Sequence, residues 1–176
     1  MIELELQDLL TEKLREIFKD YSLLANNGTL QVVQVVKQFL PQPEGMTVRA
    51  KNSAESIVPQ GYQSSDVSSI FPAIVVKVNG LTDRRELGLR KSTISAQIVV
   101  GTYDNSKDCQ GYRDVFNILS RIRLELFATP GAVLGEKFRL SFPVYSTLLD
   151  DQEWPYFFGT IDLEFEAASP LNYNYI

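Results

Sequence analysis

Apolar residues recur along this chain at two spacings, and each spacing predicts one type of element. Helical spacing, as in Leu6, Leu10 and Leu14, predicts two amphipathic helices over residues 3–20 and 110–127. Strict alternation of apolar and polar residues predicts four strands, over residues 71–79, 92–102, 138–145 and 157–167. Each of these elements therefore has one face suited to a core and one face suited to water or a partner.

Residues 30–40 fit a helical face as well as a strand, but four valines and the stop at Pro41 and Pro43 favour a strand. Residues 41–69 are rich in Pro, Gly, Ser, Gln and Asn and lack periodicity, which predicts a long loop. Such a segment can become ordered on assembly with a partner. The charged residues 80–89 are interpreted as a hairpin connection between two strands.

The order of these elements predicts an α+β fold in a single domain, residues 1–176. We expect a mostly antiparallel sheet of four to five strands with the two amphipathic helices packed on it. Pro143 lacks the N–H that a ladder bond needs, so its strand should lie at a sheet edge or contain a bulge.

Charge is distributed unevenly along the chain, although the net charge is only −5. Residues 1–20 sum to −3, residues 77–123 to +4, and the part after Arg139 to −6. An acidic chain is a poor general nucleic-acid binder, and no sequence-specific nucleic-acid contact is expected. One basic block between two acidic ends is compatible with head-to-tail docking between copies, but charge alone favours an ordinary solvated surface.

Several kinds of chemistry are excluded by composition. The chain has no histidine, and Cys109 is its only cysteine, which excludes Ser-His and Cys-His catalysis and thiolate zinc sites. No glycine-rich phosphate loop and no apolar run long enough for a membrane span is present, and residues 1–5 do not resemble a secretion signal. We therefore expect no enzyme, no cofactor, no catalytic residue and no membrane partner.

Carboxylates are the remaining acid–base candidates. Asp162, Glu164 and Glu166 alternate along one strand face, where they would hold a hard cation, face solvent or contact a second subunit. A carboxylate- or metal-dependent hydrolase built on these residues with Asp150 and Asp151 is the less favoured alternative, and we expect no metal site.

Two segments are candidates for a subunit or partner interface. One is the basic segment 84–91, and the other combines Asp150 and Asp151 with the aromatic block 154–158. The aromatic block also fits a core plug that leads into the last strand. The candidate interface residues are Arg84, Arg85, Arg90, Lys91, Asp150, Asp151, Trp154 and Tyr156.

Six short segments together resemble one protein family. They are 71–76 (FPAIVV), 98–104 (IVVGTYD), 111–118 (GYRDVFNI), 121–123 (RIR), 138–140 (FRL) and 153–159 (EWPYFFG). In this order and spacing, residues 70–168 resemble the tail terminator, or tail completion, proteins of tailed bacteriophages and contractile tail-like particles.

The resemblance implies a structural virion protein with an α+β fold. Such a protein forms a ring, typically a hexamer, that caps the tail tube, ends its growth and joins the tail to the head or neck. The implied partners are further copies of the chain, the tail tube protein, a neck or head-completion protein and, in a contractile tail, the tail sheath. The implied location is the tail or neck of the virion, assembled in the host cytoplasm. Another neck, head-completion or baseplate component of the same particle is the alternative.

Overall fold

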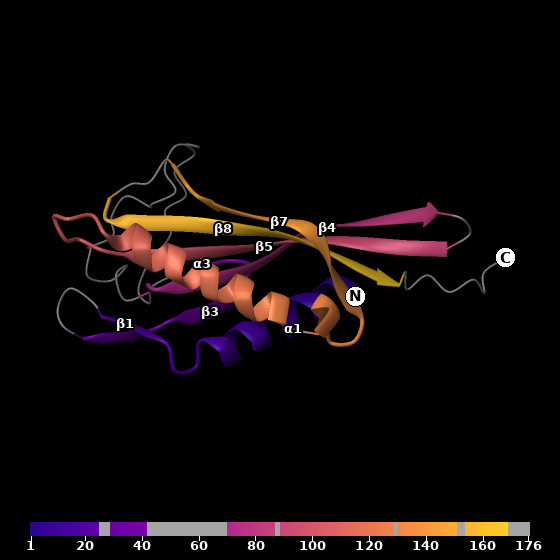
Figure 1. Ribbon diagram of the computed structural model, residues 1–176, viewed down its shortest axis with the longest axis horizontal. Coiled ribbons are helices and arrows are strands. Elements are labelled where there is room, and N and C mark those ends of the chain that lie inside the picture. The colour runs from indigo at the N-terminus through magenta and orange to yellow at the C-terminus, as the bar shows by residue number, and fades with distance from the viewer. Residues whose placement is uncertain (25–28, 42–69, 87–88, 129, 151–153, 169–176) are drawn as a thin grey trace.

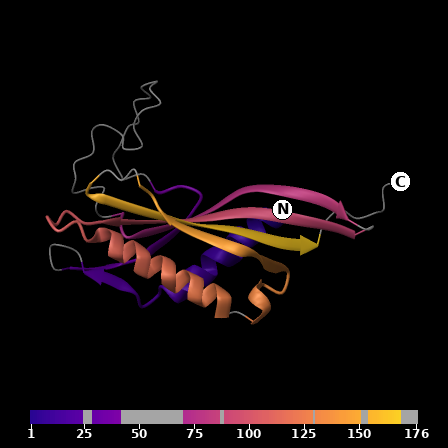
Figure 2. The ribbon, with the colours of Figure 1, turned by 45° about the horizontal axis from the view of Figure 1, so that its top comes forward.

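The computed structural model describes residues 1–24, 29–41, 70–86, 89–128, 130–150 and 154–168. In these ranges a six-stranded sheet has the order β3-β4-β5-β8-β7-β6, and helices α1 (Ile2–Ile17) and α3 (Gly111–Ala128) lie on one of its faces (Figures 1 and 2). Its strands are β3 (Gln34–Lys37), β4 (Ala73–Glu86), β5 (Leu89–Tyr103), β6 (Val133–Leu134), β7 (Phe138–Leu148) and β8 (Tyr156–Ala168). A separate pair is formed by β1 (Ser22–Leu24) and β2 (Leu30–Val32), and the short helix η1 (Pro130–Ala132) precedes β6. The predicted α+β class with two helices on a mostly antiparallel sheet is confirmed.

The core lies between the helices and the inner face of the sheet. The apolar stripe of α1 and that of α3, which includes Val115, Ile118 and Ile122, are buried against alternate residues of the central strands. On β8 these residues are Ile161, Leu163, Phe165 and Ala167, as the alternation predicted. Burial of each large side chain stabilises the fold by about 1.5–3 kcal/mol relative to exposure.

The number of strands was predicted incorrectly. The sheet has six described strands rather than four to five, because β6 is a two-residue strand that no periodicity can reveal. Residues 30–40 are also not one strand: β2 pairs with β1, whereas β3 pairs with β4. The β3–β4 pairing is parallel, although the expected connections favoured antiparallel neighbours.

Element boundaries also differ from the prediction within the described residues. The segment 80–89 is not a mere connection, because β4 continues to Glu86 and β5 begins at Leu89. Helix α1 ends at Ile17 rather than at residue 20, since Phe18 turns into the core and packs edge-on against Tyr21. The predicted loop 41–69 lies outside the described residues from position 42 onward.

Pro143 satisfies both halves of the prediction made for its strand. The register between β7 and β8 shifts between Ser141 and Tyr145, so that Pro143 lies in a bulge. Beyond Arg139, no described strand pairs with the other side of β7, which makes this part of β7 a sheet edge. The missing N–H of Pro143 therefore costs no ladder bond.

Close packing of α3 on β8 depends on Gly159. A Cβ added at Gly159 would lie 2.7 Å from Cγ1 of Val115 and 2.8 Å from Cδ1 of Leu119. We expect Gly159→Ala to lower the free energy of unfolding by about 1–3 kcal/mol through overpacking. Gly80→Ala is the control, because a Cβ at Gly80 meets nothing within 4 Å. Urea unfolding of the two variants tests this, and equal stabilities would contradict the packing argument.

Candidate functional site

The predicted basic residues meet at one end of the sheet, where β4 and β5 extend beyond the other strands (Figure 1). We call residues 81–86 and 89–91 the arm. Its backbone register pairs Arg84 with Lys91 and Arg85 with Arg90. The side chains of Arg84 and Lys91 are exposed, and Lys91 Nζ lies 3.9 Å from Glu166 Oε2. The arm therefore presents positive charge at the end of the sheet, where β8 pairs with β5 as far as Lys91 and only β4 and β5 continue beyond it.

The predicted acidic and aromatic residues lie at the opposite end of the sheet. Trp154 and Asp150 are exposed, whereas Asp151 lies outside the described residues. Tyr156 is half-buried, with its ring 5.5 Å from that of Tyr103 and 5.4 Å from that of Phe71. Tyr156 thus belongs to an aromatic cluster on the sheet, and Trp154 is the better candidate for an interface anchor.

The length of strand β8 gives the distance between the basic arm and the acidic and aromatic residues at the other end of the sheet. Its first residue, Tyr156, pairs with Tyr103, and its last, Ala168, pairs with Lys91 of the arm. A strand of this length spans roughly 40 Å at about 3.3 Å per residue. The candidate interface residues therefore form two separate groups, which one copy of the chain does not bring together.

The acidic residues of β8 project from the sheet face opposite the helices. Asp162 Oδ1 accepts a 2.8 Å hydrogen bond from Gln97 Nε2, and Asp162 and Glu164 are exposed. No group of three or more acidic, histidine or cysteine side chains within the described ranges is placed to hold a metal ion. This row therefore gives the β8 side of the sheet a negative surface.

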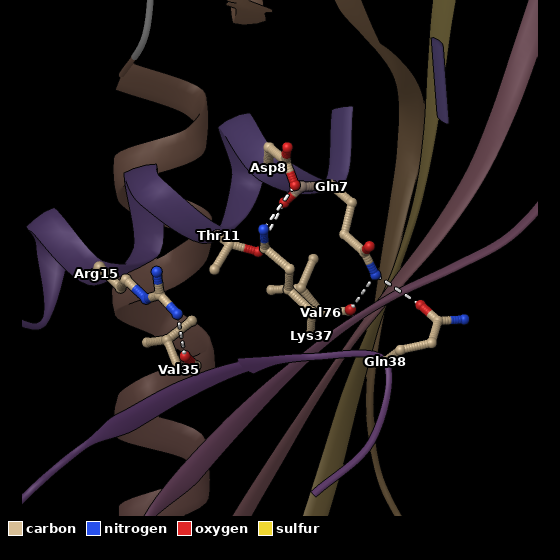
Figure 3. Close-up of polar contacts among 8 residues, drawn as sticks. All are labelled: Gln7, Asp8, Thr11, Arg15, Val35, Lys37, Gln38 and Val76. Atoms are coloured by element: carbon tan, nitrogen blue, oxygen red, sulfur yellow. Dashed lines mark hydrogen bonds and ion pairs between the residues drawn. The ribbon is translucent and has the colours of Figure 1, made fainter. Parts of the chain in front are cut away.

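Helix α1 closes the edge of the sheet formed by β3 (Figure 3). Arg15 Nη2 donates to the Val35 carbonyl at 3.2 Å, and Lys37 Nζ lies 2.6 Å from Asp8 Oδ1. These contacts occupy a strand edge that would otherwise invite pairing with another chain.

Gln7 and Gln38 bind the last backbone groups of β4 that are covered on its outer edge. Gln7 Nε2 donates to the Val76 carbonyl at 2.9 Å and to Gln38 Oε1 at 2.6 Å (Figure 3). The Gln38 amide in turn donates to the Val78 carbonyl and accepts from the Val78 N–H, both at 3.1 Å, as the next residue of a strand would. Beyond Val78, no described strand pairs with the outer edge of β4.

A shallow groove of about 280 Å³ lies where β4 leaves β3. Its lining residues are Glu3, Leu4, Gln7, Gln38, Val78, Asn79, Gly80 and Leu81. One carboxylate and three amides do not supply a nucleophile with a base, so the groove does not suggest catalysis.

A second open edge was not predicted as a site. On β7, Phe142 and Tyr145 are each 63% exposed, and the Phe142 ring lies 5.4 Å from Phe127 of α3. Leu124 on the same helix is 71% exposed. We call Leu124, Phe127 and Phe142 the α3–β7 patch, whereas Tyr145 pairs with Asp162 and lies on the sheet face opposite the helices. Phe142 follows the alternation of Phe138 and Leu140 in the predicted strand, so the sequence indicated a core residue rather than an exposed one.

Asp114 is a partly buried carboxyl in the first turn of α3. Burial raises the pKa of Asp114, and the neighbouring Asp104 raises it further. These effects outweigh the favourable charge of the helix N-terminus. The pKa of Tyr21 is raised by burial and by Asp114, against the opposing effect of Arg121.

No family model and no curated protein matches the chain. Among the described residues, no helix is long and apolar enough to cross a membrane.

Asp114 makes stability depend on pH in a defined direction. Because its folded-state pKa is raised, the folded chain binds the proton more tightly than the unfolded chain, and stability falls as pH rises through that pKa. We expect Asp114→Asn to raise the melting temperature at pH 7, with a gain that shrinks as pH falls toward the ordinary pKa of an aspartate. Thermal unfolding from pH 3.5 to 8, with Asp108→Asn as the control for charge, tests this. A lower melting temperature at pH 7 would contradict it.

Proposed function

We propose that this chain is a non-enzymatic assembly protein whose copies join head to tail into a closed ring. The observation that carries the proposal is the polarity of the sheet: a basic arm projects at one end, and exposed Asp150 and Trp154 lie at the other. A two-fold contact needs a self-complementary surface, whereas two different and distant surfaces suit a heterologous contact. Heterologous contacts generate rings when the rotation between neighbours closes.

The resemblance of residues 70–168 to tail terminator proteins gives this ring a specific role. We propose a ring, with six subunits once on the tail, that caps the tail tube, ends its growth and joins it to the head or neck. Its partners are then the tail tube protein, a neck or head-completion protein and, in a contractile tail, the sheath. Another neck, head-completion or baseplate component remains the alternative, and binding to the open end of tail tubes distinguishes the two.

Charge reversal on the arm tests the assembly. We expect Arg84→Glu with Lys91→Glu to weaken self-association about tenfold, which is about 1.4 kcal/mol, because several exposed charge pairs are lost together. Lys19→Glu with Lys107→Glu produces the same net charge at two exposed positions and is the control. Native mass spectrometry at low salt measures both. Equal loss in the two variants would mean that net charge, and not the arm, controls association.

Cation binding tests the proposal that the chain is not an enzyme. On the open face of β8, Asp162 accepts a hydrogen bond from Gln97 and Glu166 lies near Lys91, an arrangement that does not favour activation of water. We expect calorimetric titration with calcium, magnesium or manganese to show no micromolar binding. Changing Asp162, Glu164 and Glu166 to their amides should leave the melting temperature nearly unchanged. Tight cation binding that disappears in this triple variant would support the hydrolase alternative.

A further inference from the structure

We infer that neighbouring copies join by direct strand pairing, with the outer edge of β4 in the arm of one copy adding to the open edge of β7 in the next. This inference rests on the proposed ring and identifies its contact. Within the described ranges, these are the two long stretches of sheet edge that no strand or helix closes, and they lie on opposite sides of the sheet.

The backbone of β7 presents bonding groups on its open side. The Leu149 N–H donates to the Phe158 carbonyl at 3.0 Å, so Leu149 faces β8. Because residues of an antiparallel strand alternate between the two sides, the N–H and C=O groups of Ser146 and Leu148 face outward. On each strand, residues whose backbone groups face one neighbour alternate with residues whose groups face the other, and this alternation can be followed from β8 through β5 to β4. It places the N–H and C=O groups of Leu81 and Asp83 on the outer edge of β4.

Strand direction is also compatible with this contact. Strands β4 and β8 run one way, and β5 and β7 run the other way. A second copy placed beside the first without being turned over therefore brings its β7 antiparallel to β4. The joint would continue the pairing mode used by most of the sheet.

Side chains on the two edges are complementary. Arg84 and Lys91 form a register pair on the face opposite the helices, the face that Asp162, Glu164 and Tyr145 share. In the joined sheet, Arg84 would lie two strand spacings, about 10 Å at the backbone, from the acidic row of β8 in the next copy. A long arginine side chain spans most of that distance. The α3–β7 patch would at the same time lose exposed apolar surface to the arm.

The open edge of β4 and the open edge of β7 lie at different positions along the strand direction. Thr82 of the arm pairs with Thr93 of β5, which pairs with Glu166 of β8, whereas Thr147 of β7 pairs with Thr160 of β8. Thr82 and Thr147 are therefore six residues apart when both are projected onto β8. Neighbouring copies are therefore offset by about 20 Å along the strand direction. A ring with this offset closes only if the strands tilt relative to its axis, as strands do in barrels.

Disulfide trapping tests the contact directly. The exposed Cys109 is the only cysteine, so Cys109→Ser gives a background without thiols. Within one copy, Thr82 and Thr147 are separated by three strand spacings and by the offset, about 25 Å, which is far beyond disulfide reach. In this background Thr82→Cys with Thr147→Cys should give a ladder of linked oligomers on oxidation. A mixture of the two single variants should stop at dimers.

Three trapping results would overturn the inference. Disulfide-linked dimers of Thr82→Cys alone would indicate a two-fold contact between arms. A ladder from Thr82→Cys with Val32→Cys but none with Thr147→Cys would place the arm on the β2 side, where Val32 is exposed. Absence of any cross-link in a preparation that forms rings would reject the strand pairing.

Blocking the edge is the second test. Ser146→Pro removes an outward N–H without removing a bond to β8, and we expect it to weaken ring formation at least tenfold. Ser146→Ala keeps that N–H and controls for the hydroxyl, which accepts a 3.5 Å bond from Arg123 Nη1. A monomer melting temperature within a few degrees of the parent would show that Ser146→Pro folds. Rings of undiminished stability in that variant would reject the strand pairing but leave the proposed ring, whereas no ring in the parent chain, alone or on tail tubes, would reject both.

Discussion

Both helices lie on one face of the sheet, so each central strand must be apolar on that side and compatible with water or a partner on the other. Strand β8 meets this requirement most completely. Its inner row packs on α3, and its outer row carries Asp162 and Glu164. The alternation of a strand ties the two rows together, because a slip of one residue would bury the acids and expose Phe165. The core and the acidic surface are thus fixed by a single register.

The same one-sided arrangement determines which edges are protected. Helix α1 lies close enough to β3 for Arg15 to reach the Val35 carbonyl, and the Gln38 amide extends this cover to Val78. Farther along β4, and along β7 after Arg139, the described residues supply no such cover. In a protein that acts alone, open edges of this length invite aggregation, whereas in an assembly protein they are positions where a specific neighbour can bind.

Elements with their own strong period could be predicted from the sequence. The stripe Val115, Ile118 and Ile122 and the alternation in β8 each depend on local spacing, and both were predicted correctly. Features that depend on a distant partner could not be predicted. Nothing in four valines shows that β2 and β3 pair with different strands, and a two-residue strand such as β6 has no period. The arm residues were predicted as candidates from charge, whereas the α3–β7 patch appears only when Phe127 and Phe142 meet in space.

The parallel pairing of β3 with β4 has a consequence for how the chain folds. The two strands are separated by the 35 residues 38–72, whereas β4 and β5 are separated by only residues 87–88. Closing the longer connection costs about 2.5 kcal/mol more in chain entropy, if each doubling of length costs about 0.6 kcal/mol. Residues 73–168 can form most of the sheet through antiparallel neighbours before this cost is met. The N-terminal helix and β3 are therefore expected to dock late, onto a core that the rest of the chain has already formed.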